Sequence, residues 1–254
     1  MDHLPDELLL NILNYLNKEE LITTAGSCGQ LNRIAKDWTL WRNSGLVFRK
    51  KRNYNLEKVL KAFPVEYIEF SNDPCDLELR IVARNCPRLK TLALFGIRRL
   101  SHDGLSAIAE GCPNLIHLEI YAYNNEDYIY HGNLYDEYVH LLYLTLGSFL
   151  DGLYTLLETT QIADLTLWEF IIPGTHLEHI SQRCPELRRL SLTQCSGFTV
   201  RTINKLAEYC PKLERFYVDS AAMVPASEDL ANFLTQHPND SLEVYVPDNI
   251  RYIV

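Results

Sequence analysis

One nine-residue phrase occurs four times in the chain, and its spacing limits the possible folds more than any other feature. The four copies are CPRLKTLAL, CPNLIHLEI, CPELRRLSL and CPKLERFYV, which begin at Cys86, Cys112, Cys184 and Cys210. The apolar positions of each copy follow the pattern x-L-x-x-L-x-L, and weaker matches raise the number of units to about eight. Similar units at intervals of roughly 20 to 30 residues are typical of a stacked repeat protein.

Each unit predicts one helix and one short strand. Before each Cys-Pro pair, apolar residues stand at i, i+3, i+4 and i+7, as Leu105, Ile108, Ala109 and Cys112 do, which is the stripe of an amphipathic helix. Proline disfavours helical backbone in the residue before it, so we expect the helix to end at the cysteine and the cysteine side chain to lie in the core. The last two apolar marks alternate with other residues, as in a strand with one buried face.

The weaker matches extend this pattern over the middle and the ends of the repeat region. We interpret residues 141–146 as a further strand, and His237 before Pro238 as a substitute for the cysteine of the other units. Ser101 and Thr199 stand where helices are expected to begin, and their hydroxyls can cap the first turn. A single unit has too little apolar surface to be stable alone, so the units are expected to stack on one another.

Composition favours a folded protein that binds other proteins. The 254 residues are 47% hydrophobic and 22% charged, which is typical of globular domains. The net charge of −9 argues against binding to nucleic acid or to an anionic membrane, because affinity for phosphates comes mainly from Lys and Arg. The acidic N-terminus does not resemble a secretion signal, and the seven cysteines fit reduced thiols. We therefore expect a cytoplasmic or nuclear location, or both.

The first 45 residues lack the repeat and predict a small helical unit. On a helix from Asp6 to Leu16, the apolar residues spread over roughly 220° of the circumference, against about 100° for a simple surface helix. A segment of this length buries too little apolar surface to be stable by itself. The surplus apolar surface therefore indicates a binding partner.

Two family resemblances follow from these patterns. From about residue 65 onward, the chain resembles the cysteine-containing class of leucine-rich repeats. The first 45 residues resemble an F-box, on the residues Leu4-Pro5, the helix from Glu7 to Leu16, Leu21, Cys28, Ile34-Ala35 and Leu40-Trp41. The family often has Trp where this chain has Leu31. The resemblance implies an α/β protein with a helical F-box at 1–45, a linker helix at 46–64 and a repeat solenoid at 65–254, with parallel strands inside and helices outside.

The same resemblance implies a function. F-boxes dock on the small SKP-family adaptor of SCF-type ubiquitin ligases and, through it, on cullin and a RING subunit. The chain would then be the substrate-recognition subunit of such a ligase, and its arc would bind a protein target for ubiquitination. The expected adaptor-binding residues are Leu4, Pro5, Leu8, Leu9, Ile12, Leu16, Leu21 and Trp41.

The inner face of the predicted arc is the expected target-binding surface, because strand residues that alternate with core positions point there. Large aromatic side chains and arginines on such a sheet are typical of binding hot spots. Aromatic side chains also stabilise cross-strand pairs, and the sequence leaves that reading open. The expected substrate-binding residues are Tyr67, Phe95, His117, Glu119, Tyr121, Tyr143, Trp168, Arg189, Arg215 and Tyr217.

The sequence offers little for catalysis or cofactor binding. It contains no Cys-x-x-Cys pair, no glycine-rich phosphate loop and no G-x-S-x-G elbow. We therefore expect no metal, no cofactor and no catalytic residue. Two other functions stay open. One is an adaptor-bound scaffold that acts without cullin in assembly or sequestration. The other is an enzyme with a cryptic site, suggested by groups such as Ser101, His102 and Asp103.

Overall fold

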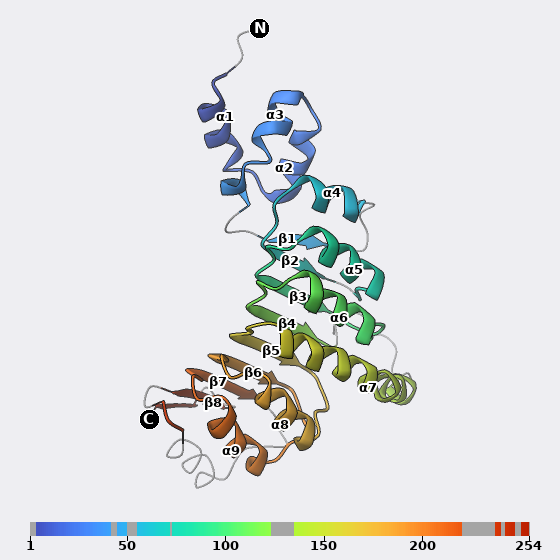
Figure 1. Cartoon of the computed structure of the whole chain (residues 1–254), viewed down its shortest axis with the longest axis vertical. Coiled ribbons are helices and arrows are strands. Elements are labelled where there is room, and N and C mark those ends of the chain that lie inside the picture. The colour runs from blue at the N-terminus through green and yellow to red at the C-terminus, as the bar shows by residue number, and fades with distance from the viewer. Residues whose placement is uncertain are drawn as a thin grey trace.

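The computed structural model shows a short helical region followed by an arc of strands and helices (Figure 1). The structure describes residues 4–41, 45–49, 55–71, 73–122, 135–219, 237–239, 242–246 and 250–253, and the side chains of 135–146 are outside that description.

The N-terminal region is made of short helices. They are α1 (Asp6–Leu13), α2 (Lys18–Ala25), α3 (Gly29–Ile34) and the 3-10 turn η1 (Trp38–Leu40). Asn17 caps α2 in a capping box, since its side chain accepts from the Glu20 amide and the Glu20 carboxylate accepts from the Asn17 amide. Such short helices depend on tertiary packing, because isolated helices of this length are unstable in water.

The arc is built on one sheet whose strands follow one another in chain order. The strands are β1 (Leu46–Phe48), β2 (Tyr67–Phe70), β3 (Thr91–Phe95), β4 (His117–Tyr121), β5 (Asp164–Trp168), β6 (Arg189–Thr193), β7 (Arg215–Asp219), β8 (Glu243–Val246) and β9 (Ile250–Ile253). All neighbours from β1 to β8 pair in parallel, and β9 is antiparallel to β8.

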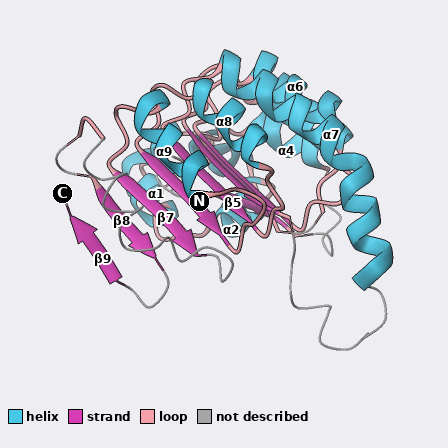
Figure 2. Ribbon diagram, turned by 90° about the horizontal axis from the view of Figure 1, so that it is seen from below, coloured by secondary structure: helices cyan, strands magenta, loops and turns pink. Residues whose placement is uncertain are grey.

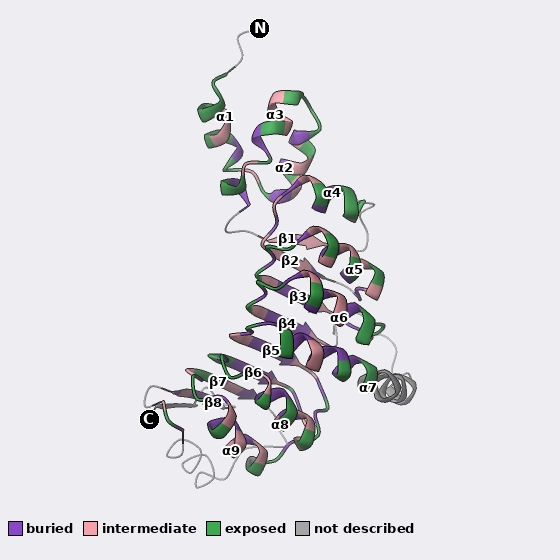
Figure 3. Cartoon of the chain, in the orientation of Figure 1, coloured by how far each residue is buried: buried purple, intermediate pink, exposed green. Residues whose placement is uncertain are grey.

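Helices cover one face of this sheet (Figure 2). They are α4 (Leu56–Ala62), α5 (Asp76–Asn85), α6 (His102–Gly111), α7 (Tyr135–Thr159), α8 (Gly174–Gln182) and α9 (Val200–Tyr209). Paired strand positions stack their apolar side chains into continuous buried rows, as Leu92, Leu118, Leu165 and Leu190 do. Buried and half-buried positions alternate along β2, β4 and β5. Figure 3 shows that the exposed residues of the helices lie mainly on their outer side. The alternation predicted from the repeat is confirmed.

The repeat cysteines lie in the core, as predicted. Cys86, Cys112 and Cys210 each follow the last residue of a helix and are buried. Burial raises the pKa of these three thiols to about 12, so they stay protonated at neutral pH. Cys112 directs its thiol to the carbonyl of Cys86 at 3.5 Å. His237 does the same with Nε2, 3.1 Å from the carbonyl of Cys210, so His replaces Cys in the last unit.

The helix starts are also as predicted. Ser101 caps α6 by accepting from the amide of Asp103 at 3.3 Å, and its own hydroxyl donates to Asp76 at 2.6 Å. Thr199 forms a capping box with Thr202 at the start of α9. These polar contacts satisfy amide groups that a helix start leaves without intrahelical partners.

Two parts of the arc differ from the sequence prediction. The strand expected at 141–146 is wrong, because these residues lie inside α7, and β4 pairs directly with β5. Leu142, Leu146, Phe149 and Leu153 recur at helical intervals of three and four, and this period prevails over the alternating marks. The sheet also begins earlier than expected, since β1 lies within the stretch 46–64, ahead of α4.

Candidate functional site

Helix α1 is apolar on two sides. Leu9, Leu13 and Leu16 face the core of the N-terminal region, and Leu13 is fully buried. A second stripe faces outward. It consists of Leu4, Leu8, Ile12 and Tyr15, which are 50%, 50%, 52% and 90% exposed. Leu8 and Ile12 are four positions apart on one side of α1, and Leu4 and Tyr15 are exposed just before and just after the helix, so the four residues are here called the outward stripe.

Polar contacts hold α1 in this orientation. Arg33 of α3 forms an ion pair with Asp6 at 2.6 Å, and Gln30 donates to the carbonyl of Leu4 at 3.0 Å. The hydrogen bond from Gln30, together with Arg33, keeps the pKa of Asp6 below its ordinary value. These contacts lie beside the helix start and leave the outward stripe uncovered by the described residues.

Two of the expected adaptor-binding residues are in the core instead. Leu21 is 1% exposed and Trp41 is 2% exposed, so neither is accessible to a partner. Trp41 stacks on Phe63 with ring centroids 4.6 Å apart, donates its indole N–H to the carbonyl of Ala35 at 2.7 Å, and lies under Lys18. These contacts join the helical region to the arc, which is a structural role.

Leu9 and Leu16 are half-buried, whereas Pro5 is exposed beside the outward stripe. Tyr15 and Trp38 were not among the residues expected to bind the adaptor, although Trp38 is 52% exposed on η1. The signal for Tyr15 was its position three residues after Ile12, in the turn that follows α1.

The expected target-binding residues fall into register on the uncovered face of the sheet. Strand pairing aligns Tyr67, His117, Arg189 and Arg215 in a first row, Glu119 and Tyr217 in a second, and Phe95, Tyr121 and Trp168 in a third. Tyr143 does not belong to this face, because its backbone is part of α7 and its side chain lies outside the described residues. Nine of the ten expected positions are therefore brought together.

The first row contains paired charges. Arg189 binds Asp164 with two hydrogen bonds of 2.6 and 2.5 Å, and His117 contacts the same carboxylate through Nδ1. Arg215 lies 3.5 Å from Glu243. A bidentate arginine–carboxylate pair fixes the orientation of both side chains.

The third row is a stack of aromatic rings, here called the aromatic ladder. The rings of Phe95 and Tyr121 are parallel, with an interplanar angle of 9° and a centroid distance of 4.1 Å. Trp168 continues the ladder at 5.7 Å from Tyr121. All three side chains are half-buried, so they present ring surface to solvent. Tyr217 and Tyr245 form a similar stack in the second row, at 4.4 Å.

The second row also contains two glutamates that are bound by hydroxyl groups. Glu69 accepts from Tyr67 at 3.1 Å and from Ser71 at 3.0 Å, and Glu119 accepts from Tyr121 at 3.3 Å. Burial, followed by the negative charge of the neighbouring carboxylates, raises the pKa of Tyr67 and Tyr121 to about 12. The two phenols therefore stay protonated at neutral pH and donate hydrogen bonds.

The structure does not assemble the catalytic group considered from the sequence. Asp103 forms an ion pair with Arg80 at 2.6 Å. The Ser101 hydroxyl donates to Asp76 and accepts from the amide of Asp103 at the start of α6. The ring of His102 has the Ser106 hydroxyl 3.2 Å from Nε2. Within the described residues, no three His, Cys, Asp or Glu side chains are grouped so that they could hold a metal ion.

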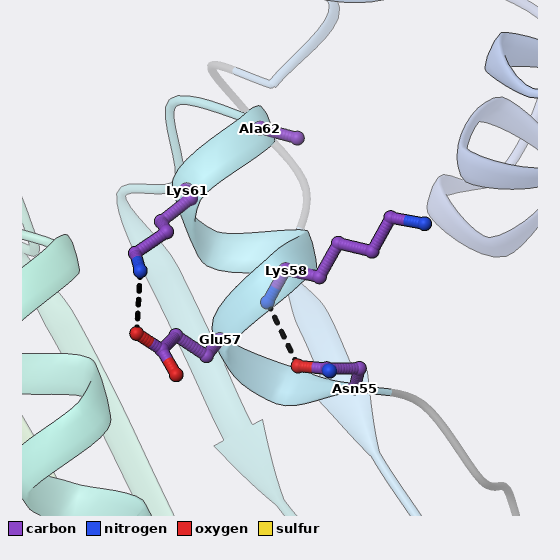
Figure 4. A pocket seen from close by; sticks show the side chains of 5 residues that line it. All are labelled: Asn55, Glu57, Lys58, Lys61 and Ala62. Atoms are coloured by element: carbon purple, nitrogen blue, oxygen red, sulfur yellow. Dashed lines mark hydrogen bonds and ion pairs between the residues drawn. The ribbon is translucent and has the colours of Figure 1, made fainter.

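A surface depression on α4 is also lined by solvated groups (Figure 4). Lys61 pairs with Glu57 at 2.5 Å, and Asn55 caps the helix by accepting from the amide of Lys58 at 3.0 Å. Two charged residues that neutralise each other and a helix cap do not define a ligand site. Separately, no helix in the described part of the chain has the length and apolar character needed to cross a membrane.

Comparison with known proteins agrees with the N-terminal interpretation. A family model described as F-box-like matches residues 1–46. A putative F-box/LRR-repeat protein 23 of Arabidopsis thaliana is 40% identical over 63 residues, which are 25% of this chain and 14% of that protein.

Two solved structures match the chain with TM-scores below 0.5. The leucine-rich repeat-containing protein LegL7 of Legionella pneumophila has a TM-score of 0.49 and 12% identity, over 81% of this chain and 64% of that one. The yeast complex of Rad7 and Elc1 has a TM-score of 0.35 and 16% identity, over 94% and 67%. The assignment of the arc rests on its own strand order and register. The chain therefore combines an F-box-like domain at residues 1–46 with an arc of parallel strands and helices like that of leucine-rich repeats.

Proposed function

We propose that the chain is the substrate receptor of an SCF-type ubiquitin ligase. The observation that carries the proposal is the outward stripe, an apolar surface on the F-box-like domain that no described residue of the chain covers. The domain would dock on an SKP-family adaptor, and through it on cullin and a RING subunit. The arc would hold a protein target.

The outward stripe supports adaptor binding for an energetic reason. Leu4, Leu8 and Ile12 are each about half exposed. Burial of these apolar side chains against a partner would lower the free energy of the complex. Pro5 and Tyr15 extend the same surface. Leu9 and Leu16 would contribute by holding the helix in place from its inner side.

The uncovered face of the sheet supports target binding. It places aromatic rings, arginines and carboxylates on a rigid scaffold, and such positions are typical of binding hot spots. A receptor of this kind promotes ubiquitin transfer by holding the target near the ligase, which raises the effective concentration of the reactants. On this proposal no residue of the chain takes part in bond formation.

The test is co-purification of the tagged intact chain, followed by mass spectrometry for the adaptor and cullin. The double substitution Leu8→Asp and Ile12→Asp should abolish recovery of both subunits, because charged side chains cannot enter an apolar interface without a large desolvation cost. Thr23→Asp and Ser27→Asp, at exposed positions of the same domain, are the matched control and should leave recovery unchanged. Circular dichroism checks that both variants are folded.

The outcomes separate the proposed function from its rival. Recovery of adaptor and cullin with the intact chain and the control variant, but not with the stripe variant, supports the receptor function. Recovery of the adaptor without cullin favours the scaffold that acts in assembly or sequestration. Recovery of neither subunit with the intact chain would contradict the docking role of the outward stripe.

A further inference from the structure

The uncovered face of the arc is divided into a neutralised part and an acidic part. Asp164 is neutralised by Arg189, and Glu243 lies near Arg215. Glu69 and Glu119 differ, because the hydrogen bonds described for them come from neutral Tyr and Ser hydroxyls and no ion pair joins them to any described residue. The first half of the arc thus contains two half-buried carboxylates without a described cationic partner.

These two carboxylates belong to strands on either side of β3, whose backbones are about 10 Å apart. Strand pairing places Ala93 between Glu69 and Glu119 in the second row. Ala93 is 0% exposed although it alternates with the core positions Leu92 and Leu94. The charge of Glu119 also contributes to the raised pKa of Tyr67, and that of Glu69 to the raised pKa of Tyr121. Tyr67, Glu69, Glu119 and Tyr121 therefore form one group, here called the carboxylate–tyrosine cluster.

The aromatic ladder begins beside this cluster. Tyr121 belongs to both, since its ring stacks on Phe95 and its hydroxyl donates to Glu119. The second and third rows are two residues apart along the strands, which is about 6.6 Å. A ligand that reaches the cluster with one side chain therefore reaches the ladder with a side chain one or two positions away.

We propose, on the basis of the proposed function, that the protein target presents an arginine or lysine to the carboxylate–tyrosine cluster and a neighbouring apolar or aromatic side chain to the aromatic ladder. Charge complementarity favours this occupant, because a cation neutralises two carboxylates that the chain itself does not neutralise. Arginine suits the site best. Its planar guanidinium donates to several acceptors at once and stacks on aromatic rings.

The net charge of the chain is consistent with a basic partner. At −9, the whole molecule attracts positively charged segments and repels acidic ones. The arginines of β6 and β7 each lie beside a carboxylate, Arg189 with Asp164 and Arg215 with Glu243, so they oppose a basic side chain at β2–β4 less than unpaired cations would.

The probe for this inference is a random dodecapeptide library displayed on phage and selected on the intact chain. Enriched peptides should contain Arg or Lys within two positions of an aromatic or branched apolar residue. A selected peptide is then synthesised, together with a form in which citrulline, the neutral analogue of arginine, replaces each Arg. The citrulline form should bind about tenfold more weakly, as expected for loss of a charge-assisted hydrogen bond.

Substitutions in the chain locate the contact. Glu69→Gln together with Glu119→Gln keeps the shape of both side chains and should weaken the selected peptide about tenfold. The matched control, Glu110→Gln together with Asp151→Asn, removes two charges from exposed positions on the helical side, α6 and α7, and should leave affinity within about twofold. Urea unfolding shows whether the variants are equally stable.

Three results would overturn the inference. The first is a set of peptides without basic residues whose binding is lost in the variant Tyr121→Ala and Trp168→Ala. Such a result would keep the uncovered face as the binding surface but contradict a basic ligand. The second is a set of basic peptides whose binding is unchanged by the glutamate substitutions. The third is a selection that enriches no peptide. The adaptor co-purification does not depend on any of these results, so the two proposals fail separately.

Discussion

Helices α1 and α6 are similar in length but bury their apolar residues differently. In α6, the apolar residues Leu105, Ile108 and Ala109 are all buried, and the helix presents a polar outer side. In α1, only Leu13 is buried, whereas Leu8 and Ile12 are about half exposed. Stacking of repeats buries most of the apolar side chains of the arc, whereas the F-box-like domain leaves the outward stripe exposed.

The two helices differ because α6 packs against more neighbouring elements than α1 does. Each inner helix of the arc packs on the sheet and on the helices of the units before and after it, as α6 does between α5 and α7. Glycine permits this close packing, since a Cβ at Gly152 of α7 would lie 2.8 Å from the Cα of His102. Helix α1 has one layer of neighbours, so one side of an apolar helix stays uncovered by the described chain.

The largest effect is expected where the two regions meet. Trp41→Ala should lower the free energy of unfolding by ~3–5 kcal/mol, because it removes a buried ring, its stacking on Phe63 and its hydrogen bond to Ala35. Urea unfolding of the intact chain measures the loss. Trp38→Ala, at an exposed position, is the control, with an expected change of about 0.5 kcal/mol or less. Equal losses for the two variants would mean that the junction is not packed as described.

The second prediction compares a leucine of each region. Leu190→Ala should cost ~2–5 kcal/mol, since Leu190 is 1% exposed in the stacked row between β5 and β7. Leu8→Ala should change stability by only about 0.5 kcal/mol but weaken adaptor binding. Urea unfolding and co-purification of each variant separate the two effects. A large loss of stability in the Leu8 variant would assign the outward stripe to the core.

The fold could be predicted to this extent because the repeat is local. The Cys-Pro pair marks the end of α5, α6 and α9, and the alternating marks fix the inner and outer positions of the strand that follows. Residues 141–146 show the limit. The apolar positions of this segment fit both a strand and a helix. Because β4 pairs directly with β5, the sheet has no place for a strand between them, and the segment is part of α7.

The candidate site was predicted less completely, because accessibility depends on packing between regions. Leu21 and Trp41 belong to the F-box-like pattern as much as Leu8 does, but the contact with Phe63 and the core places them inside. Similarly, the sequence puts Glu69 and Asp164 on the same face. Which of the two is neutralised by a cation depends on the register that brings Arg189 beside Asp164.

A smaller effect should appear with pH in the last unit of the arc. Burial lowers the pKa of His237 below its ordinary value of 6.5, so between these two values the unfolded chain binds a proton that the folded chain does not. Stability should therefore be constant above about pH 7 and fall as pH decreases through 6.5, by at most ~1.4 kcal/mol per pH unit.

The variant His237→Cys tests the assignment, because it restores the residue of the other units and keeps a thiol near the carbonyl of Cys210. Unfolding is followed in urea at pH 7.5 and pH 5.5 for both chains. The variant should lose less stability at the lower pH than the native chain. An identical loss in both chains would assign the pH dependence to other groups.

The smallest predicted effect is the contribution of the aromatic ladder to the stability of the fold. A double-substitution cycle with Phe95→Leu and Tyr121→Leu should give a coupling of about 0.5–1.5 kcal/mol, the usual value for a stacked aromatic pair. The rings are half-buried, so part of their surface is left for a ligand. If binding of a selected peptide falls much more than stability in the Tyr121 variant, recognition is the main role of the ladder. If stability falls and peptide binding does not, the rings stabilise the sheet, and target recognition has to be assigned to other positions of the arc.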